Sequence, residues 1–287
     1  MIIGENRNTV IHNIKTACEN RTFYSKVETN DPTLSKTESD RIVFGYAENR
    51  DTLPFKVKAS VARRIADIAT YALNRNTEII GLEKLCDIDG GAIITSNHFS
   101  PIENTGIRLA VKKAGKKRLN IVSQETNLAM TGIIGFLMKY ADIIPISDNK
   151  DYLMHTFPEI LSSLLQNKEF VLIYPEQEMW FNYKKPRPPK RGAYYYAAKF
   201  SVSIISCFIT MTDTEELDTS EFRKVKFTVH ILDVIKPNPS LSVKENSQIM
   251  LEKDYRLKTS AYESFYGKQL SYTFSCDDIG GWIGDGI

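Results

Sequence analysis

His98 and Glu103 are the residues whose types and spacing best suit general-base chemistry. A strand-like run at 92–95 ends just before His98, and a helix is expected to begin near Pro101. A neutral imidazole beside a helix N-terminus can accept a proton, and a carboxylate one turn away can hold its other ring nitrogen and stabilise the imidazolium. The nucleophile would then be a hydroxyl group of the substrate.

A structural role for the same two residues stays open. Ser100 followed by Glu103 completes the Ser-x-x-Glu capping-box pattern, which places a glutamate at this position without any catalysis. His98 could equally cap a helix or fill space. From these residues alone, the catalytic and structural interpretations weigh about equally.

A second polar group follows an apolar run at 170–173. The run continues into Tyr174-Pro175-Glu176-Gln177, at the expected carboxyl edge of a sheet, where parallel α/β folds bind ligands. The proline-rich loop after it carries five cations, namely Lys184, Lys185, Arg187, Lys190 and Arg191, and the aromatic residues Trp180, Phe181 and Tyr183. We interpret this segment as a phosphate-binding loop with lipid anchors. The alternative is a solvated basic loop.

The elements that must position these residues indicate an α/β fold. Short apolar runs bounded by turn residues alternate with helical stretches, and they lie at 92–95, 119–123, 142–146, 170–174 and 203–209. This spacing predicts a mostly parallel central sheet flanked by helices. Residues 225–232 alternate like an edge or antiparallel strand, and a charged helix is expected around 245–266.

The N-terminal part is predicted to be a helical extension, residues 1–78, which precedes the domain at 79–287 that carries His98 and Glu103. A helix is expected near 9–19 and another at 55–73, where apolar residues recur on one face at Val57, Val61, Ile65, Ile68 and Ala72. The second helix also carries Lys56, Lys58, Arg63 and Arg64, which suits anionic lipid. Packing of the stripe on the domain's own core is the more usual alternative.

Composition excludes several classes of protein. Lys and Arg total 37 against 35 Asp and Glu, a net charge of +2 that gives no reason to expect nucleic acid as a partner. The four cysteines lack paired spacing, which favours a reducing cytosol and no zinc site. Residues 1–8 lack a secretory pattern, and the apolar window 128–138 is about half a membrane span. The sequence has no Gly-rich nucleotide-binding motif, which argues against a nucleotide-binding enzyme, and no Gly-x-Ser-x-Gly, which argues against a serine hydrolase.

The glycine-rich end at 280–286 is expected to be loosely ordered.

Two motifs resemble one known family. Asn97-His98 with Glu103 resembles the His-x4-Asp motif of glycerol-3-phosphate and lysophospholipid acyltransferases, and Tyr174-Pro175-Glu176 resembles their Phe-Pro-Glu-Gly-Thr-Arg block. Gly192-Ala193 is similar to the start of the helix that follows this block. The likeness covers about residues 80–210. It departs at Glu103, where the family has aspartate, and at 177–179, where the family's arginine is absent.

The resemblance implies an O-acyltransferase of phospholipid biosynthesis, in which His98 draws a proton from an acceptor hydroxyl that attacks an acyl thioester. The donor would be acyl-CoA or an acyl carrier protein, with no bound cofactor and no metal. The implied partners are a lysophospholipid-like acceptor (1-acylglycerol-3-phosphate type), the membrane surface and an acyl carrier protein. The implied location is cytoplasmic, peripheral to the inner face of the cell membrane, and residues 128–138 would line the acyl chain's site or touch lipid.

Substrate contacts are expected at eight residues: Asn97, Tyr174, Pro175, Glu176, Gln177, Lys184, Lys185 and Arg187. Because the acid and the arginine positions depart from the family pattern, two alternatives stay open. One is a catalytically weakened member of the fold that binds lipid or an acyl carrier. The other is a thioesterase, in which water replaces the acceptor alcohol.

Overall fold

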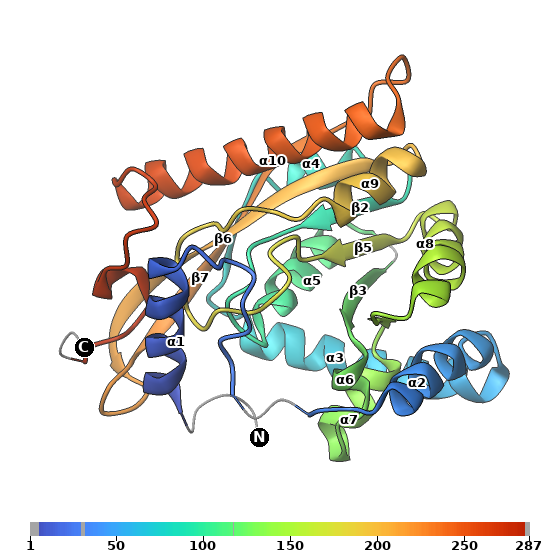
Figure 1. Cartoon of the computed structure of the whole chain (residues 1–287), viewed down its shortest axis with the longest axis horizontal. Helices are drawn as coiled ribbons and strands as arrows, with labels where there is room; N and C mark the ends of the chain where they lie inside the picture. The colour runs from blue at the N-terminus through green and yellow to red at the C-terminus, as the bar shows by residue number, and fades with distance from the viewer. Residues whose placement is uncertain (1–5, 30–31, 117, 285–287) are drawn as a thin grey trace.

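The computed structural model describes residues 6–29, 32–116 and 118–284, and within them a seven-stranded sheet forms the centre (Figure 1). The order across the sheet is β1-β7-β6-β2-β5-β3-β4. In chain order the strands are β1 Glu78–Ile80, β2 Ala92–Thr95, β3 Leu119–Gln124, β4 Ile143–Ile146, β5 Phe170–Ile173, β6 Ser203–Leu217 and β7 Arg223–Ile235. Neighbouring strands are parallel except β6 and β7. The predicted mostly parallel sheet is confirmed.

Both faces of the sheet are apolar, because its central strands are buried on each side. Ile94 belongs to a buried cluster that includes Ile107, whereas its neighbour Ile93 belongs to a second cluster on the opposite face with Leu161. Alternation along the strand therefore divides the core into two layers. The continuous apolar runs of the sequence reflect this double burial.

Helices cover the two faces separately (Figure 1). On one face α5 (Glu103–Lys113) contacts β3 and β7, and α3 (Leu53–Leu73) packs outside α5 and α7 (Gly132–Tyr140). The opposite face is covered by α8 Phe157–Gln166, α9 Gly192–Lys199 and α10 Val243–Tyr266. The charged helix expected at 245–266 is confirmed as α10. It begins with a Ser242–Glu245 capping box and ends at Gly267 in the left-handed region.

Further helices and short turns complete the described chain. The N-terminal helices are α1 Arg7–Glu19 and α2 Lys36–Asn49, and the short elements are α4 Glu83–Cys86, α6 Glu125–Leu128, a π-helical turn Tyr152–Thr156 and a 3-10 turn Cys276–Asp278. The helix near 9–19 is confirmed as α1. Helix α2 was not expected, yet Val43 on it is fully buried in the second cluster. The division into 1–78 and 79–287 stays a prediction.

Two local expectations have different outcomes. The edge or antiparallel strand expected at 225–232 is confirmed as the antiparallel strand β7, while the short strand β1, which pairs with β7, forms the edge of the sheet. The glycine-rich end is tied down as far as it is described, since Gly280 N–H donates to the Asn182 carbonyl and Gly281 N–H donates to Asp213. Residues 285–287 of that expectation lie outside the described residues.

The membrane-related segments can also be placed. Over the described ranges, the helices are too short or too polar to span a bilayer. The apolar window at 128–138 falls on the end of α6 and on α7, where Ile133 is 66% exposed. Helix α7 is thus partly buried, since Gly135 is buried and Met138 packs against the first cluster, and a contact of this window with the acyl chain or with lipid stays a prediction.

Candidate active site

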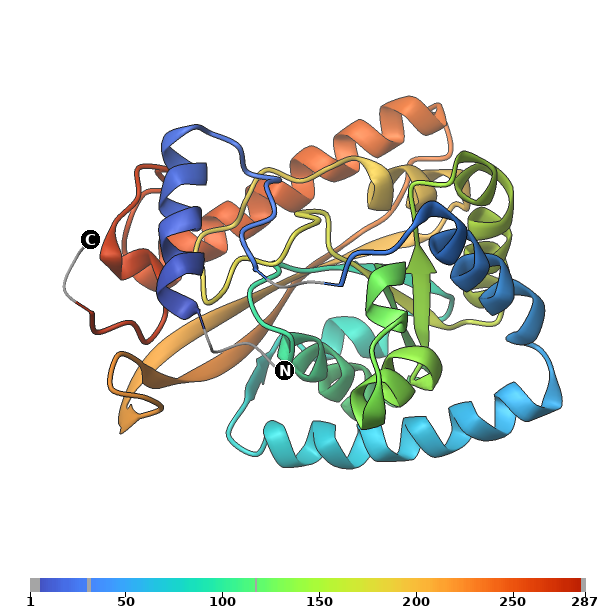
Figure 2. The ribbon, with the colours of Figure 1, turned by 60° about the horizontal axis from the view of Figure 1, so that its bottom comes forward.

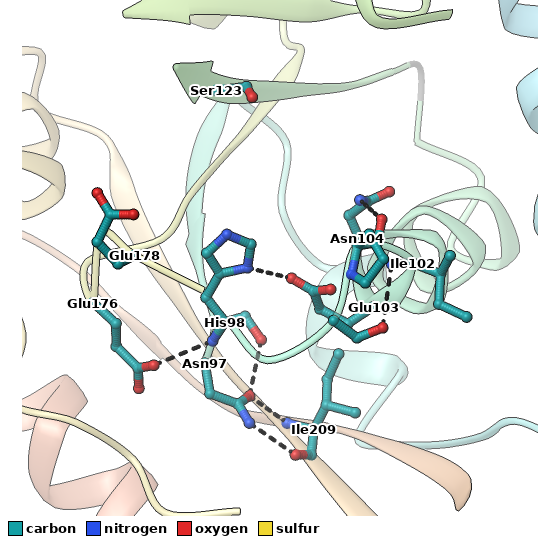
Figure 3. A network of polar contacts seen from close by, with 12 residues as sticks. Asn97, His98, Ile102, Glu103, Asn104, Ser123, Glu176, Glu178 and Ile209 are labelled. Atoms are coloured by element: carbon teal, nitrogen blue, oxygen red, sulfur yellow. Dashed lines mark hydrogen bonds and ion pairs between the residues drawn. The ribbon is translucent and has the colours of Figure 1, made fainter. Parts of the chain in front are cut away.

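His98 lies just beyond the carboxyl end of β2, and its ring is oriented by Glu103 (Figure 3). The distance from His98 Nδ1 to Glu103 Oε1 is 2.5 Å. The Glu103 side chain is completely buried, whereas the His98 side chain is 22% exposed. No described residue hydrogen-bonds to His98 Nε2. One ring nitrogen is therefore held by a carboxylate, and the other remains accessible.

The capping-box interpretation of Glu103 is wrong. Helix α5 begins at Glu103 itself, after an N-cap at Ile102 that makes no side-chain cap hydrogen bond. Ser100 Oγ accepts only a long 3.4 Å hydrogen bond, from Ile102 N–H. Because Pro101 lies in the turn before the helix, the first helical residue is Glu103, and its carboxylate turns toward His98 rather than toward the cap.

Asn97 fixes the loop that carries His98. Its side-chain amide donates to the Ile209 carbonyl at 3.0 Å, and its oxygen accepts from Ile209 N–H at 2.9 Å (Figure 3). Asn97 is 1% exposed, and this two-way contact joins the loop after β2 to β6. The expectation that Asn97 binds substrate is therefore wrong, because both polar ends of the amide are used inside the protein.

Glu176 holds the same loop from the side of β5. Its carboxylate accepts from His98 N–H at 3.2 Å and from Arg187 N–H at 2.9 Å. The Arg187 guanidinium also lies 3.1 Å from it, and both side chains are nearly inaccessible. Glu176 thus positions the backbone of His98, and the substrate role expected for it is contradicted by its burial.

The basic loop is also a structural feature, which corrects the phosphate interpretation. Arg187 is 1% exposed and lies over the Trp180 ring at 4.4 Å. Lys185 Nζ is 2.6 Å from the buried carboxylate of Asp278, and Lys184 Nζ is 3.6 Å from Asp213. Burial lowers the pKa of Arg187, which Glu176 counteracts. Lys185 and Arg187 are neutralised inside the protein and are not free for a phosphate, whereas Lys184 lies near the partly exposed Asp213 and its phosphate contact stays a prediction.

The aromatic residues of the loop do not face lipid. Trp180, Phe181 and Tyr183 are 0%, 7% and 2% exposed, and they form a buried cluster with helix α1. Trp180 Nε1–H donates to the Ser25 carbonyl at 3.0 Å. The expected lipid anchors are thus the core that attaches the N-terminal helix to the loop beyond β5.

Tyr174 and Glu178 border the His98 ring. The Tyr174 ring is stacked on it, with centroids 4.0 Å apart and planes 12° apart. Glu178 lies on the side of the imidazole away from Glu103 (Figure 3), and it accepts from Gln124 Nε2, at the end of β3, at 2.9 Å. Glu178 was not among the expected site residues. The strand order could have indicated it, because β3 and β5 are neighbours and their carboxyl ends share an edge.

The remaining expected residues are less informative. Pro175 is buried, and its carbonyl accepts from Lys190 N–H at 2.7 Å. Gln177 is exposed and has a positive φ of 65°. Within the described part of the chain, no group of three His, Cys, Asp or Glu side chains is arranged to hold a metal ion.

Comparison with known proteins decides the class of this site. Residues 76–210, which include His98, Glu103 and the loop beyond β5, match the family model described as Acyltransferase. The matched segment, which carries both motifs, is similar to acyltransferases. The resemblance noted from the two motifs is thereby confirmed, and the protein is an acyltransferase in its enzyme class.

The likeness of this acyltransferase to individual proteins is distant. No curated protein matches its sequence. Among solved structures, it is similar to the crystal structure of the 1-acyl-sn-glycerophosphate (LPA) acyltransferase, PlsC, from Thermotoga maritima, at 16% sequence identity and a TM-score of 0.49. The similarity covers 82% of this chain and 93% of that chain.

Proposed function

We propose that this acyltransferase moves a fatty acyl group from acyl-CoA or acyl carrier protein to a hydroxyl group of a lysophospholipid-like acceptor in phospholipid biosynthesis. The observation that carries the proposal is the His98–Glu103 pair, in which Glu103 binds Nδ1 and leaves Nε2 accessible. This arrangement suits a base for an alcohol. No bound cofactor is required by it, because the acyl donor is a substrate.

The proposed reaction follows from the geometry of the ring. Nε2 of His98 takes the proton of the acceptor hydroxyl while its oxygen attacks the thioester carbonyl. Glu103 stabilises the imidazolium that forms, since its carboxylate faces Nδ1–H. When the tetrahedral intermediate collapses, the C–S bond breaks and the imidazolium returns its proton to the leaving thiolate. The products are an ester and a free thiol.

We propose that the acceptor binds with its hydroxyl at Nε2 of His98 and that its charged group does not contact the buried cations Lys185 and Arg187. Lys185 and Arg187 are bound by buried carboxylates, so they supply no phosphate contact, and Lys184 is partly exposed beside Asp213. Glu178 instead places a carboxylate near the ring. The acceptor panel in the test below therefore includes 1-acylglycerol-3-phosphate and the uncharged 1-acylglycerol.

A membrane surface is the proposed location, supported by helix α3. Three residues of its apolar stripe face outward, since Val57, Val61 and Ile68 are 57%, 49% and 72% exposed. Packing of this stripe on the domain core, the more usual alternative, is excluded by these values. Helix α3 runs along the outside of the molecule beside α7 (Figure 2), on which Ile133 is also exposed.

Charge on α3 supports an anionic lipid surface. Arg64 lies between Val61 and Ile68 on the exposed stripe, and Lys56 and Lys58 are also exposed. An amphipathic helix binds at an interface by burying apolar side chains while its cations contact anionic head groups. We propose that α3 and α7 dock on the cytoplasmic face of the cell membrane and bring the site to its lipid acceptor.

Vesicle sedimentation tests this docking. Replacing Val57, Val61 and Ile68 together by serine is expected to weaken binding to vesicles with anionic lipid about tenfold or more, because three aliphatic side chains no longer enter the interface. Ile249→Ser is the control, since Ile249 is 50% exposed on α10, across the sheet from α3. Equal binding by the triple variant and the wild type would contradict the proposal.

Product analysis with a radiolabelled acyl thioester tests the reaction. We expect an acylated lipid whose formation depends on the added acceptor, with either coenzyme A or acyl carrier protein as the donor's thiol. Free fatty acid as the sole product would instead identify a thioesterase. Lipid binding without any thioester cleavage would identify a non-catalytic member of the fold.

A further inference from the structure

Tyr174 follows β5 directly, and its aromatic ring covers one face of His98. The stacking at 4.0 Å and 12° limits rotation of the imidazole. The hydrogen bond from Nδ1 to Glu103 fixes one atom of the imidazole, and a stacked neighbour restrains the plane of the whole ring. The two contacts together define where Nε2 points.

Two buried polar atoms beside this stack have no hydrogen-bond partner within the described residues. They are the Tyr174 hydroxyl and Oε2 of Glu103, the carboxylate oxygen that His98 does not use. A buried donor and a buried acceptor are each costly when unpaired. A phenol and a carboxylate oxygen are complementary, so pairing them removes both penalties.

The protonation state of Tyr174 suits this pairing. Burial, and then the nearby Glu103 carboxylate, raise the pKa of Tyr174 well above its ordinary value of 10.0. A raised pKa keeps the phenol protonated at neutral pH, so the hydroxyl is available as a donor. Its neighbour Glu103 offers only acceptors when ionised.

We propose that Tyr174 is a positioning residue whose hydroxyl donates a hydrogen bond to Oε2 of Glu103 while its ring restrains the imidazole of His98. This inference rests on the proposed function and replaces the substrate contact expected for Tyr174. The resembled motifs have phenylalanine in place of Tyr174 and aspartate in place of Glu103. The proposed hydrogen bond therefore joins two residues that differ from the family motifs, Tyr174 and Glu103.

Tyr174→Phe tests the hydroxyl, because it keeps the stacked ring. We expect kcat to fall about tenfold with KM changed less than about twofold, as for loss of one hydrogen bond to a charged group outside the substrate contact. The acid limb of the kcat/KM profile should move to higher pH, since an unshared carboxylate charge holds the imidazolium proton more strongly. Tyr196→Phe is the control, because Tyr196 is also stacked and partly buried but lies on α9.

A double-mutant cycle separates this contact from a general packing effect. Glu103→Asp shortens the acid and withdraws its carboxylate from the phenol, so Tyr174→Phe should cost less than about twofold in that background. A full and additive loss when Tyr174→Phe is combined with Glu103→Asp would overturn the proposal. An unchanged kcat and pH profile for Tyr174→Phe in the otherwise wild-type enzyme would do the same.

A spectroscopic measurement distinguishes failure of this inference from failure of the proposed function. The Nδ1–H proton of His98, observed by NMR in protein labelled with ¹⁵N-histidine and assigned with His98→Gln, should shift in Tyr174→Phe and not in Tyr196→Phe. This readout needs no substrate. An unshifted proton overturns the role of Tyr174, whereas absence of acyl transfer by the wild type overturns the proposed function alone.

Discussion

At the residue scale, the proposed catalysis depends on the contact between the Glu103 carboxylate and the His98 ring. Glu103 was compatible with both a helix cap and a catalytic pair, and the structure decides for the contact with His98. The capping-box rule failed because the turn at Pro101 delays the start of the helix by two residues, from Pro101 to Glu103. A short-range pattern cannot show this, since the direction of Glu103 depends on the loop that Asn97 fastens to β6.

Replacing Glu103 measures how much the His98–Glu103 pair contributes to kcat. Glu103→Gln should lower kcat by roughly 10²–10⁴-fold, because an amide keeps the size of the side chain but does not stabilise an imidazolium. Glu103→Asp should retain more activity, since it keeps the charge. Steady-state kinetics check both variants, and equal activity of wild type and Glu103→Gln would count against a catalytic role for the pair.

Glu178 gives a prediction about acceptor charge. Its carboxylate lies on the side of His98 away from Glu103 (Figure 3), so it is expected to repel a phosphate-bearing acceptor that binds there. Glu178→Gln should raise kcat/KM for 1-acylglycerol-3-phosphate about 2–5-fold relative to uncharged 1-acylglycerol, and less so at high salt. Identical relative rates for the two enzymes would show that the acceptor's charge lies outside the reach of Glu178.

At the element scale, the strands were more predictable than the loops. Continuous apolar runs marked β2 and β5 because both strands are buried on two faces. Strand β1 was missed because it has three residues and an exposed, partly buried, exposed pattern. The basic loop was misinterpreted because its partners are distant in sequence: Lys185 pairs with Asp278, which is 93 residues away.

The loop beyond β5 gives a stability prediction. Arg187→Met leaves the buried carboxylate of Glu176 without its cation, which should lower the free energy of unfolding by about 3–5 kcal/mol in urea titrations. Lys190→Met, at an exposed residue of the same loop whose Nζ lies 3.7 Å from the centre of the Tyr24 ring, should change it by less than about 1 kcal/mol. If Arg187 instead bound the phosphate of the acceptor, its replacement would raise the KM for the acceptor and leave the stability unchanged.

At the scale of the whole molecule, the sheet brings together segments that the sequence keeps apart. The carboxyl ends of β2, β5 and β3 place His98, Tyr174 and Gln124 at one edge. The fold class and the edge were predictable from strand spacing. Helix α2 was missed although Ser35 and Glu38 form a capping box at its start, because only Val43 of this helix is buried and its apolar stripe is therefore weak.

The reactivity of the four cysteines tests whether the core is packed as described. Cys86 and Cys276 are exposed, whereas Cys18 and Cys207 are buried. Burial raises the pKa of Cys207 to about 12 and also raises that of Cys18, so neither is a thiolate at neutral pH. An aromatic disulfide reagent should therefore modify two thiols in the native protein and four after unfolding. Rapid native reaction of a third thiol would contradict the arrangement of the core.

The most direct test of the central claim is the rate of acyl transfer by His98→Ala. We predict a fall in kcat of about 10³-fold or more with the same acyl thioester and lipid acceptor, because the variant lacks the imidazole that takes the proton of the acceptor hydroxyl. Circular dichroism should show the variant folded, since the imidazole side chain is partly exposed. Transfer at more than about a tenth of the wild-type rate by the folded variant would contradict the account.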